Sequence, residues 1–309
     1  MNDERFRLGD EAGQALSERR AVVAVETVVL THGLPQHVRL DTAARMDAAI
    51  RTAGAVPAFV GLIRGVLCVG VKPEALFAAC GANALKASLS TLAIGVAQVR
   101  SGGTTVAGTL AAAALARIPV AVAGGIGGLH RGWQQDLDVS GDLTALARHP
   151  VALVCSGPKA LLDVPATMEA LEGLGVPVIG LGVDRAPVFY HNRSTVPVER
   201  IASARQAAEI AAAHFDLLAG SGGVLVLNPV PEGSALDADQ VEAAVASALR
   251  EAHGAHVTGP AVTPLLQAAI LRATGGASAM QNQAMLVANA ELAGHLAVEL
   301  SLLRARTQK

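Results

Sequence analysis

The sequence contains the stretch Val151-Ala152-Leu153-Val154-Cys155-Ser156-Gly157-Pro158-Lys159, in which five apolar residues lead directly into a polar turn. An apolar run without alternation is typical of a strand that is covered on both faces, as in a mainly parallel sheet. Further runs of this kind lie at residues 22–26, 56–63, 66–69, 120–123, 176–179, 188–190 and 224–227. The pattern therefore predicts a sheet at the centre of the fold.

Helical patterns alternate with these runs. They cover residues 40–52, 73–79, 88–99, 104–115, 159–171, 198–218 and 237–252, and a longer one spans 265–304 with a break at Gly275-Gly276. The charged start of the chain, residues 1–20, also has a helical pattern. This alternation predicts a three-layer α/β/α fold with a central, mainly parallel or mixed sheet and a helical C-terminal third. No stretch resembles a linker, so we expect residues 1–309 to form one domain.

The composition excludes several classes of protein. Hydrophobic residues make up 51% of the 309 residues and charged ones 16%, which excludes general disorder. A net charge of −2 gives no basic surplus for binding a nucleic acid polymer. The apolar stretch 55–71 is interrupted by Pro57 and Arg64, which favours two strands over a membrane span. The chain starts without a signal-peptide pattern, and its three cysteines have no zinc or disulfide spacing. We expect a cytoplasmic protein with no membrane partner.

Lysine is rare in this chain, so each one is informative. Lys72, Lys86, Lys159 and Lys309 stand against twenty arginines. Arginine cannot replace a lysine that must lose its proton and attack a carbonyl carbon. Lys159 follows a buried strand at the expected start of a helix, where apolar neighbours and the helix dipole would lower its pKa. The alternative is a surface lysine at a helix N-terminus.

Glu26 ends the apolar run 22–26. A carboxylate in such a run is costly unless it is paired, and burial would raise its pKa towards the range of a general acid. Since perturbed carboxylates also occur in structural networks, an equal alternative is that Glu26 caps backbone amides at the end of the strand.

A glycine-rich turn, residues 124–128, follows the run 120–123. Glycines let backbone N–H groups approach a phosphate or a sugar closely. Asp136, Asp138 and Asp142 come next, and an acidic cluster suits a hard cation such as Mg²⁺ or Mn²⁺. The alternative is that Asp138 or Asp142 caps the helix that follows. A second candidate anion site is the turn 101–105, which opens another helix.

Five ordered blocks resemble the pseudouridine-5′-phosphate glycosidase family, also called indigoidine-synthase-A-like, over about residues 21–298. They are ETVVLTHGLP (26–35), GGIGGLHRG (124–132), DVSGDL (138–143), CSGPK (155–159) and NPVPE (228–232). The resemblance implies an α/β/α fold, a homotrimer and a reaction at C1 of ribose 5-phosphate assisted by Mn²⁺, with Mg²⁺ as the alternative ion. It makes Lys159 the Schiff-base lysine, Glu26 the proton donor and Asp138 a metal ligand acting largely through water. It places the following residues at substrate-binding positions, with the first against the phosphate: Lys86, Thr105, Val106, His130, Ser140, Gly141, Asp142 and Asn282.

Departures from the family pattern bear on which molecule is joined to, or released from, C1 of the sugar. The family's Lys-Val-Ser-Arg-Arg-Asp reads Lys-Ala-Ser-Leu-Ser-Thr at residues 86–91, so both arginines are lost. Ala123 replaces a threonine, and Trp133 stands where the family has smaller residues. Losing polar donors should weaken recognition of uracil. The sequence therefore favours the C-glycosynthase branch, which joins C1 of ribose 5-phosphate to an aromatic natural-product acceptor.

Two other hypotheses stay open. The first is a pseudouridine-5′-phosphate glycosidase that releases uracil and ribose 5-phosphate by the same lysine Schiff-base chemistry. The second is a catalytically inactive protein that binds a sugar phosphate.

Overall fold

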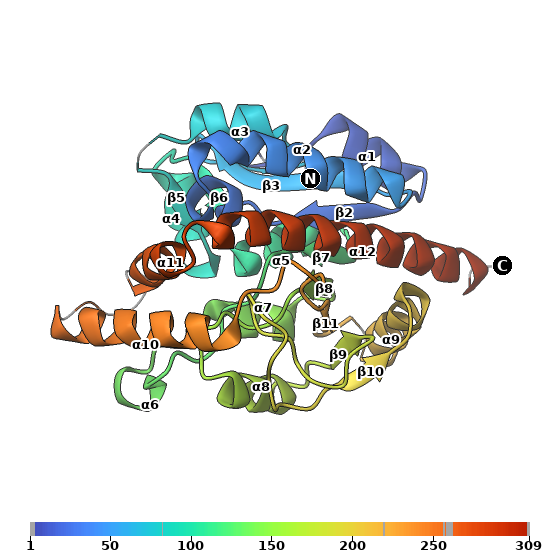
Figure 1. The fold of residues 1–309 in the computed structure, drawn as a ribbon. Coiled ribbons are helices and arrows are strands. Elements are labelled where there is room, and N and C mark those ends of the chain that lie inside the picture. Colours follow the sequence, from blue (N-terminus) through green and yellow to red (C-terminus); the bar gives the residue numbers. More distant parts are fainter. Residues whose placement is uncertain (1–3, 82, 219, 256, 258–261, 308–309) are drawn as a thin grey trace.

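The computed structural model describes residues 4–81, 83–218, 220–255, 257 and 262–307, and Figure 1 shows strands and helices alternating along most of the chain. The strands are β1 (Phe6–Leu8), β2 (Val22–Val25), β3 (Val56–Ile63), β4 (Val66–Val69), β5 (Leu85–Ala87), β6 (Gly102–Thr104), β7 (Val120–Val122), β8 (Ala152–Cys155), β9 (Val178–Leu181), β10 (Glu199–Ile201) and β11 (Val224–Leu227). They form one mixed sheet in the order β1-β4-β3-β2-β7-β8-β11-β9-β10, with β6 paired to β3 and β5 paired to β6. The pairs are parallel except where β3 meets β4 and β6.

Helices cover both faces of this sheet. They are α1 (Asp10–Ser17), α2 (Arg39–Thr52), α3 (Pro73–Ala79), α4 (Leu89–Ala97), α5 (Val106–Leu115), α6 (Trp133–Asp136), α7 (Gly141–Arg148), α8 (Val164–Gly173), α9 (Ala204–Leu217), α10 (Ala238–Gly254), α11 (Val262–Ala273) and α12 (Ala277–Thr307). Two short turns of other helical types lie at Val29–Gly33 (π) and Gln36–Val38 (3₁₀). The predicted three-layer fold and the helical C-terminal third are confirmed.

Two hydrophobic clusters explain why the strands are apolar throughout. Val23 and Val25 of β2 point into a cluster with α2, α9, α10 and α12, whereas Val22 and Ala24 point into a cluster with α1, α5, α7 and α8. Successive side chains of a strand face opposite sides of the sheet, so a sheet with helices on both faces needs apolar residues at every position.

Helix α12 runs across the middle of the molecule (Figure 1) and packs against α2, α9 and the strands β2, β7 and β8. By length and composition its segment Ala277–Arg306 could cross a membrane, but half of its most apolar window is buried inside the molecule. This burial is typical of a core helix. The stretch 55–71 forms β3 and β4, as predicted.

Four predicted elements differ from the structure. Residues 188–190 make only isolated bridges, because Val188 pairs with nearby His191 in a tight turn. The helix predicted from residue 159 begins at Val164, where Asp163 accepts a hydrogen bond from the Ala166 N–H group as its N-cap. Short edge strands, β1 and β10, take the first residues of the helices predicted at 1–20 and 198–218.

The sheet topology positions the candidate site. Strands β2, β7 and β8 are neighbours and run parallel, so the segments that follow them leave at the same edge of the sheet. These segments begin with Glu26, with the glycine-rich turn 124–128 and with the turn 156–159.

Candidate active site

Glu26 lies directly after β2, and its side chain is buried, with 4% of the residue exposed. Its backbone N–H donates to the Val122 carbonyl oxygen, and the Val29 N–H group donates to Glu26 Oε1 at 3.3 Å. Burial raises the pKa of this carboxyl to about 8; the charge of Lys159 opposes the rise and that of Asp142 adds to it. The group is therefore mostly protonated at neutral pH. Both sequence interpretations hold in part, because the carboxyl accepts a backbone amide and also has the pKa of a general acid.

The chain after Glu26 forms the π-helical turn Val29–Gly33, a rare conformation that is frequent at functional sites. This turn carries His32, which the sequence reasoning did not single out. Its Nε2 donates to the Ala84 carbonyl oxygen at 3.0 Å, so Nδ1, 2.8 Å from Thr31 Oγ1, is the acceptor nitrogen of the ring. Burial lowers the pKa of His32, and Lys86 adds to this effect. Both effects favour the neutral imidazole, and Lys86 is close enough for its charge to act on the ring.

Lys159 is half-buried in a turn whose backbone is fixed from both sides. Its N–H group donates to the Ile126 carbonyl oxygen at 3.1 Å, and the Phe189 N–H group donates to the Pro158 carbonyl oxygen at 3.0 Å. The prediction that Lys159 stands at a helix start is wrong, because α8 begins five residues later at Val164. The turn instead rests against the glycine-rich turn, which includes Ile126.

Lys86 lies on β5 and is half-buried. Burial lowers the pKa of its amine, and the charge of Lys159 lowers it further. Because Lys159 acts on both Lys86 and Glu26, the structure brings these three predicted site residues into one electrostatic cluster.

Asp142 is 5% exposed and connects two backbone segments. The Ala107 N–H group donates to its Oδ1 and the Gly127 N–H group to its Oδ2, both at 2.9 Å. A Cβ atom at Gly127 would lie 2.3 Å from Ser140 Oγ, so this approach requires glycine. Asp142 thus ties the first turn of α5 to the glycine-rich turn.

The helix caps at this edge of the sheet differ from the predicted ones. Ser140 is the N-cap of α7 and accepts from the Asp142 N–H group at 3.2 Å, so neither Asp138 nor Asp142 has that role. Thr105 caps α5 by accepting from the Gly108 N–H group at 3.3 Å. Val106, the first residue of α5, is buried, and Gly141, the first residue of α7, is exposed.

The candidate metal site contains two side chains. Asp138 Oδ2 lies 3.4 Å from His130 Nδ1, and both side chains are partly exposed. Within the described residues no group of three or more His, Cys, Asp or Glu side chains could hold a metal ion, and the side chain of Asp136 lies outside them. Mg²⁺ commonly binds one or two carboxylates and keeps several waters, so Asp138 fits a hard cation held mainly through water.

Asn282 approaches from α12 and is 8% exposed. Burial raises the pKa of Tyr190 to about 12, with a hydrogen bond from Asn282 opposing the rise, while Asn282 Oδ1 has no hydrogen-bond partner among the described residues. Tyr190 has a φ of 95°, which is strained for a residue other than glycine and which the sequence reasoning did not foresee. Tyr190 is adjacent to Phe189, whose bond to Pro158 brings this segment beside the Lys159 turn. No hydrogen bond joins Asn282 to Lys159 or Glu26, all three of which lie within the described residues.

A buried asparagine on α12 fixes the strand ends below the site. Asn289 is 0% exposed; its Oδ1 accepts from Ser156 Oγ at 3.1 Å and from Asn228 Nδ2 at 3.0 Å. Its Nδ2 donates to the carbonyl oxygens of Ala123 and Gly124. One side chain therefore joins α12 to the ends of β7, β8 and β11.

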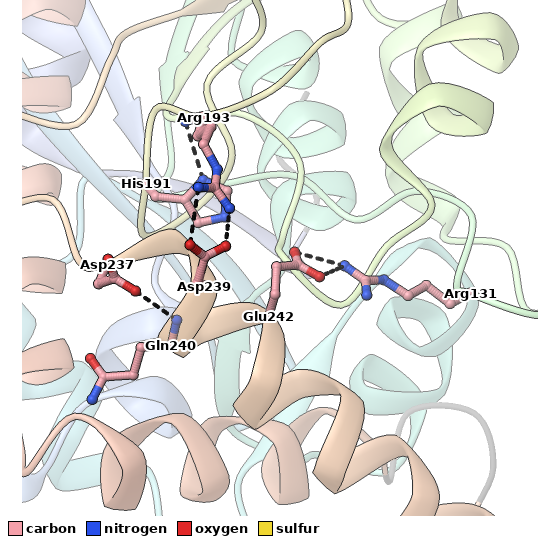
Figure 2. Close-up of polar contacts among 7 residues, drawn as sticks. All are labelled: Arg131, His191, Arg193, Asp237, Asp239, Gln240 and Glu242. Atoms are coloured by element: carbon pink, nitrogen blue, oxygen red, sulfur yellow. Dashed lines mark hydrogen bonds and ion pairs between the residues drawn. The ribbon is translucent and has the colours of Figure 1, made fainter.

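Arg131 supports the Lys159 turn from the other side. Its Nη2 donates to the Ala160 carbonyl oxygen at 2.8 Å, and its Nε donates to the Leu162 carbonyl oxygen at 3.4 Å. Figure 2 shows the same guanidinium paired with Glu242 on α10. A second ion pair, between Arg193 and Asp239, ties α10 to the segment after Tyr190. Of these two ion pairs, only Arg131–Glu242 includes a side chain that is also hydrogen-bonded to the residues directly after Lys159.

Comparisons with known proteins agree with this architecture over nearly the whole chain. The family model described as "Indigoidine synthase A like protein" matches residues 11–299. A pseudouridine-5′-phosphate glycosidase of Myxococcus xanthus is 45% identical over 296 residues, covering 95% of this chain and 97% of that protein. One from Chloroflexus aurantiacus is 43% identical, covering 96% of this chain and 99% of that protein.

Two solved structures also match. The prealnumycin C-glycosynthase AlnA in complex with ribulose 5-phosphate has a TM-score of 0.90 and 37% identity, covering 98% of this chain and 99% of that one. An indigoidine synthase A-like protein from Thermotoga maritima has a TM-score of 0.86 and 32% identity, covering 96% of both chains. The names of the curated relatives favour the glycosidase hypothesis over the synthase that the sequence departures favoured.

Proposed function

Because the chain belongs to the indigoidine synthase A-like protein family, we propose that it is a pseudouridine-5′-phosphate glycosidase. The reaction adds water across the C–C bond between C1 of the sugar and C5 of uracil. Uracil leaves with a proton on C5, and the sugar leaves as ribose 5-phosphate with the oxygen of water on C1. The observation that carries the proposal is the burial of Glu26, which raises its pKa to about 8, within the electrostatic influence of Lys159.

Lys159 and Glu26 would divide the chemistry between them. Glu26 gives its proton to the ring oxygen as the sugar ring opens, and the Lys159 amine bonds to C1. When the C–C bond breaks, its electron pair stays on C5 of uracil, which then takes a proton, while the nitrogen lone pair forms a C=N bond to C1. Water hydrolyses this imine, which returns the amine and releases the sugar. A carboxylic acid pair alone would not suffice, since a C-glycoside has no oxygen or nitrogen leaving atom.

Neighbouring residues would bind and orient the substrate. Lys86 would bind the phosphate group of the substrate. Its side chain is a half-buried cation, and it lies close enough to Lys159 for the two charges to interact. Thr105, Val106, Ser140, Gly141 and Asp142 line the two helix starts beside the glycine-rich turn. Asn282 offers a buried carbonyl oxygen that no residue in the described ranges donates to, which suits an N–H donor of the base.

Asp138, with His130 beside it, would hold Mn²⁺ or Mg²⁺. Such an ion supplies positive charge for oxygen ligands of the substrate. The proposal includes a homotrimer, which light scattering on the purified protein tests directly.

The second candidate function is a C-glycosynthase, and the TM-score of 0.90 to AlnA favours it. The two functions share the lysine chemistry and differ in the carbon partner. Near the predicted phosphate lysine, Leu89 is half-buried and Ser90 exposed, at positions where the family pattern has arginines. A synthase would use this less charged surface to accept an aromatic ring.

The deciding experiment measures uracil release from pseudouridine 5′-phosphate with Mn²⁺, alongside borohydride trapping with ribose 5-phosphate. A glycosidase releases uracil and is trapped at Lys159, and Lys159→Ala abolishes both signals. Trapping at Lys159 without uracil release would replace the glycosidase by the synthase. Absence of both signals in folded protein would leave the catalytically inactive sugar-phosphate-binding protein. Lys72→Ala is the matched control, because Lys72 lies at the start of α3 and outside the cluster.

A further inference from the structure

A separate pocket lies at the amino ends of the central strands, whereas Glu26 lies at their carboxyl ends. It has a volume of about 240 Å³, and its walls include Val22 at the start of β2 and Pro119 just before β7. The four residues of β2 separate this pocket from Glu26, a distance of about 13 Å at ~3.3 Å per residue. None of the residues assigned to the candidate active site is among those that line it.

Four arginines line this pocket and come from three parts of the chain. Arg19 and Arg20 follow α1, Arg117 follows α5, and Arg304 is near the end of α12. Arg19 and Arg117 both have left-handed backbones, with φ of 57° and 58°, at the turns that end their helices. These two turns bring the ends of α1 and α5 to the same hollow, and Ser301 Oγ on α12 donates to the Arg19 carbonyl oxygen.

The positive charge of the pocket is only partly balanced. Arg20 pairs with Glu18 at 2.7 Å, and Asp216 attracts Arg304. The side chain of Arg117 has no hydrogen bond or ion pair with another residue in the described part of the chain, and no acidic side chain is among the described lining residues. Burial lowers the pKa of Arg304, so its charge is incompletely solvated. An anion in the pocket would offset this cost.

The size and chemistry of the pocket define the class of ligand. A volume of about 240 Å³ is roughly that of eight liquid waters. This is smaller than the roughly 300–1,000 Å³ of pockets for drug-sized ligands. Guanidinium groups bind phosphate oxygens bidentately, which a single lysine amine cannot do. We propose that this pocket binds a small phosphate-bearing anion at a site separate from the candidate active site.

The experiment titrates pyrophosphate into the full-length protein by calorimetry, with no divalent metal present. In the double variant Arg117→Gln/Arg304→Gln we expect the Kd to rise at least tenfold. The matched control, Arg193→Gln/Arg205→Gln, removes two exposed arginines that pair with Asp239 and Glu209 elsewhere, and should keep the Kd within twofold. Lys86→Met removes the phosphate candidate of the active site and should leave pocket binding intact.

A second measurement is independent of the binding heat. Pyrophosphate should raise the Tm of Lys86→Met, which lacks the phosphate lysine of the active site, but not that of the triple variant Lys86→Met/Arg117→Gln/Arg304→Gln, because a ligand stabilises only a fold that binds it. Unchanged binding in the pocket variant would overturn the proposal. So would loss of all binding in Lys86→Met, or equal weakening in both arginine double variants, since these results indicate the active site or general charge attraction.

Discussion

Replacing Glu26 with glutamine should stabilise the protein at alkaline pH while removing its proposed proton donor. Glutamine has nearly the shape of glutamate and keeps a carbonyl oxygen that can accept from the Val29 N–H group. It never ionises, so it avoids the cost of a buried negative charge. A substitution at a catalytic residue that increases stability is expected where the fold has tolerated an unfavourable group for chemistry.

The size of the gain follows from proton linkage. Burial raises the pKa of Glu26 from 4.5 to about 8, so between these values the folded chain keeps a proton that the unfolded chain releases. The free energy of unfolding of the wild type therefore falls as pH rises through this window, by up to about 1.4 kcal/mol per pH unit. Glu26→Gln lacks this loss, so its advantage is near zero at pH 4.5 and reaches about 3 kcal/mol at pH 7.

Urea unfolding of both proteins at several pH values between 5 and 9 measures this advantage. The difference in free energy of unfolding should grow with pH and level off above pH 8. Asp142→Asn is the control for a second buried carboxylate; it should lose stability at every pH, because an amide nitrogen cannot accept the backbone N–H bond that Asp142 accepts. A difference between Glu26→Gln and wild type that is constant over the pH range would refute the reasoning.

Three further predictions follow from the site. The kcat/KM of the wild type should fall above pH 8, as Glu26 loses its proton, and a pH–rate profile without a step near that value would contradict its role as the acid. Arg131→Gln should lower kcat by ~10-fold or more by loosening the Lys159 turn, whereas Arg193→Gln, which breaks the other pair on α10, should not; steady-state kinetics compare the two. Asn289→Leu should cost about 2–4 kcal/mol in urea unfolding, because it leaves several buried polar groups unpaired; a loss below 1 kcal/mol would show that the network contributes little.

The fold was predictable because its strongest signals are local. Strands such as β3 and β8 are apolar at every position, and this identifies a sheet covered on both faces. Two of the four elements that were predicted wrongly are decided by distant partners. The edge strands β1 and β10 have partly exposed positions and become strands only through pairing with β4 and β9. Residues 188–190 have a strand-like sequence, but a tight turn at Tyr190 interrupts any ladder.

The candidate site was predictable to the level of residue type. A lone carboxylate at the end of an apolar strand and a lysine in an arginine-rich chain make Glu26 and Lys159 the candidates, and the family blocks add the other candidate positions. Sequence spacing could not show that the Asp142 carboxylate would accept hydrogen bonds from two backbone N–H groups. Nor could it show that Lys159 would lie five residues before the start of its helix. Both depend on where the glycine-rich turn folds.

The amino-acid sequence by itself determines that a sheet forms, which residues face its two helical layers, and which rare polar groups follow the strands. Those properties depend on side-chain chemistry and on near neighbours. Only the tertiary structure brings Glu26, Lys86 and Lys159 close enough for their charges to interact, with His32 and Arg131 nearby. It also brings four arginines together in the pocket at the other ends of the central strands. Burial and charge proximity set these properties, and both arise only when segments far apart in sequence pack together.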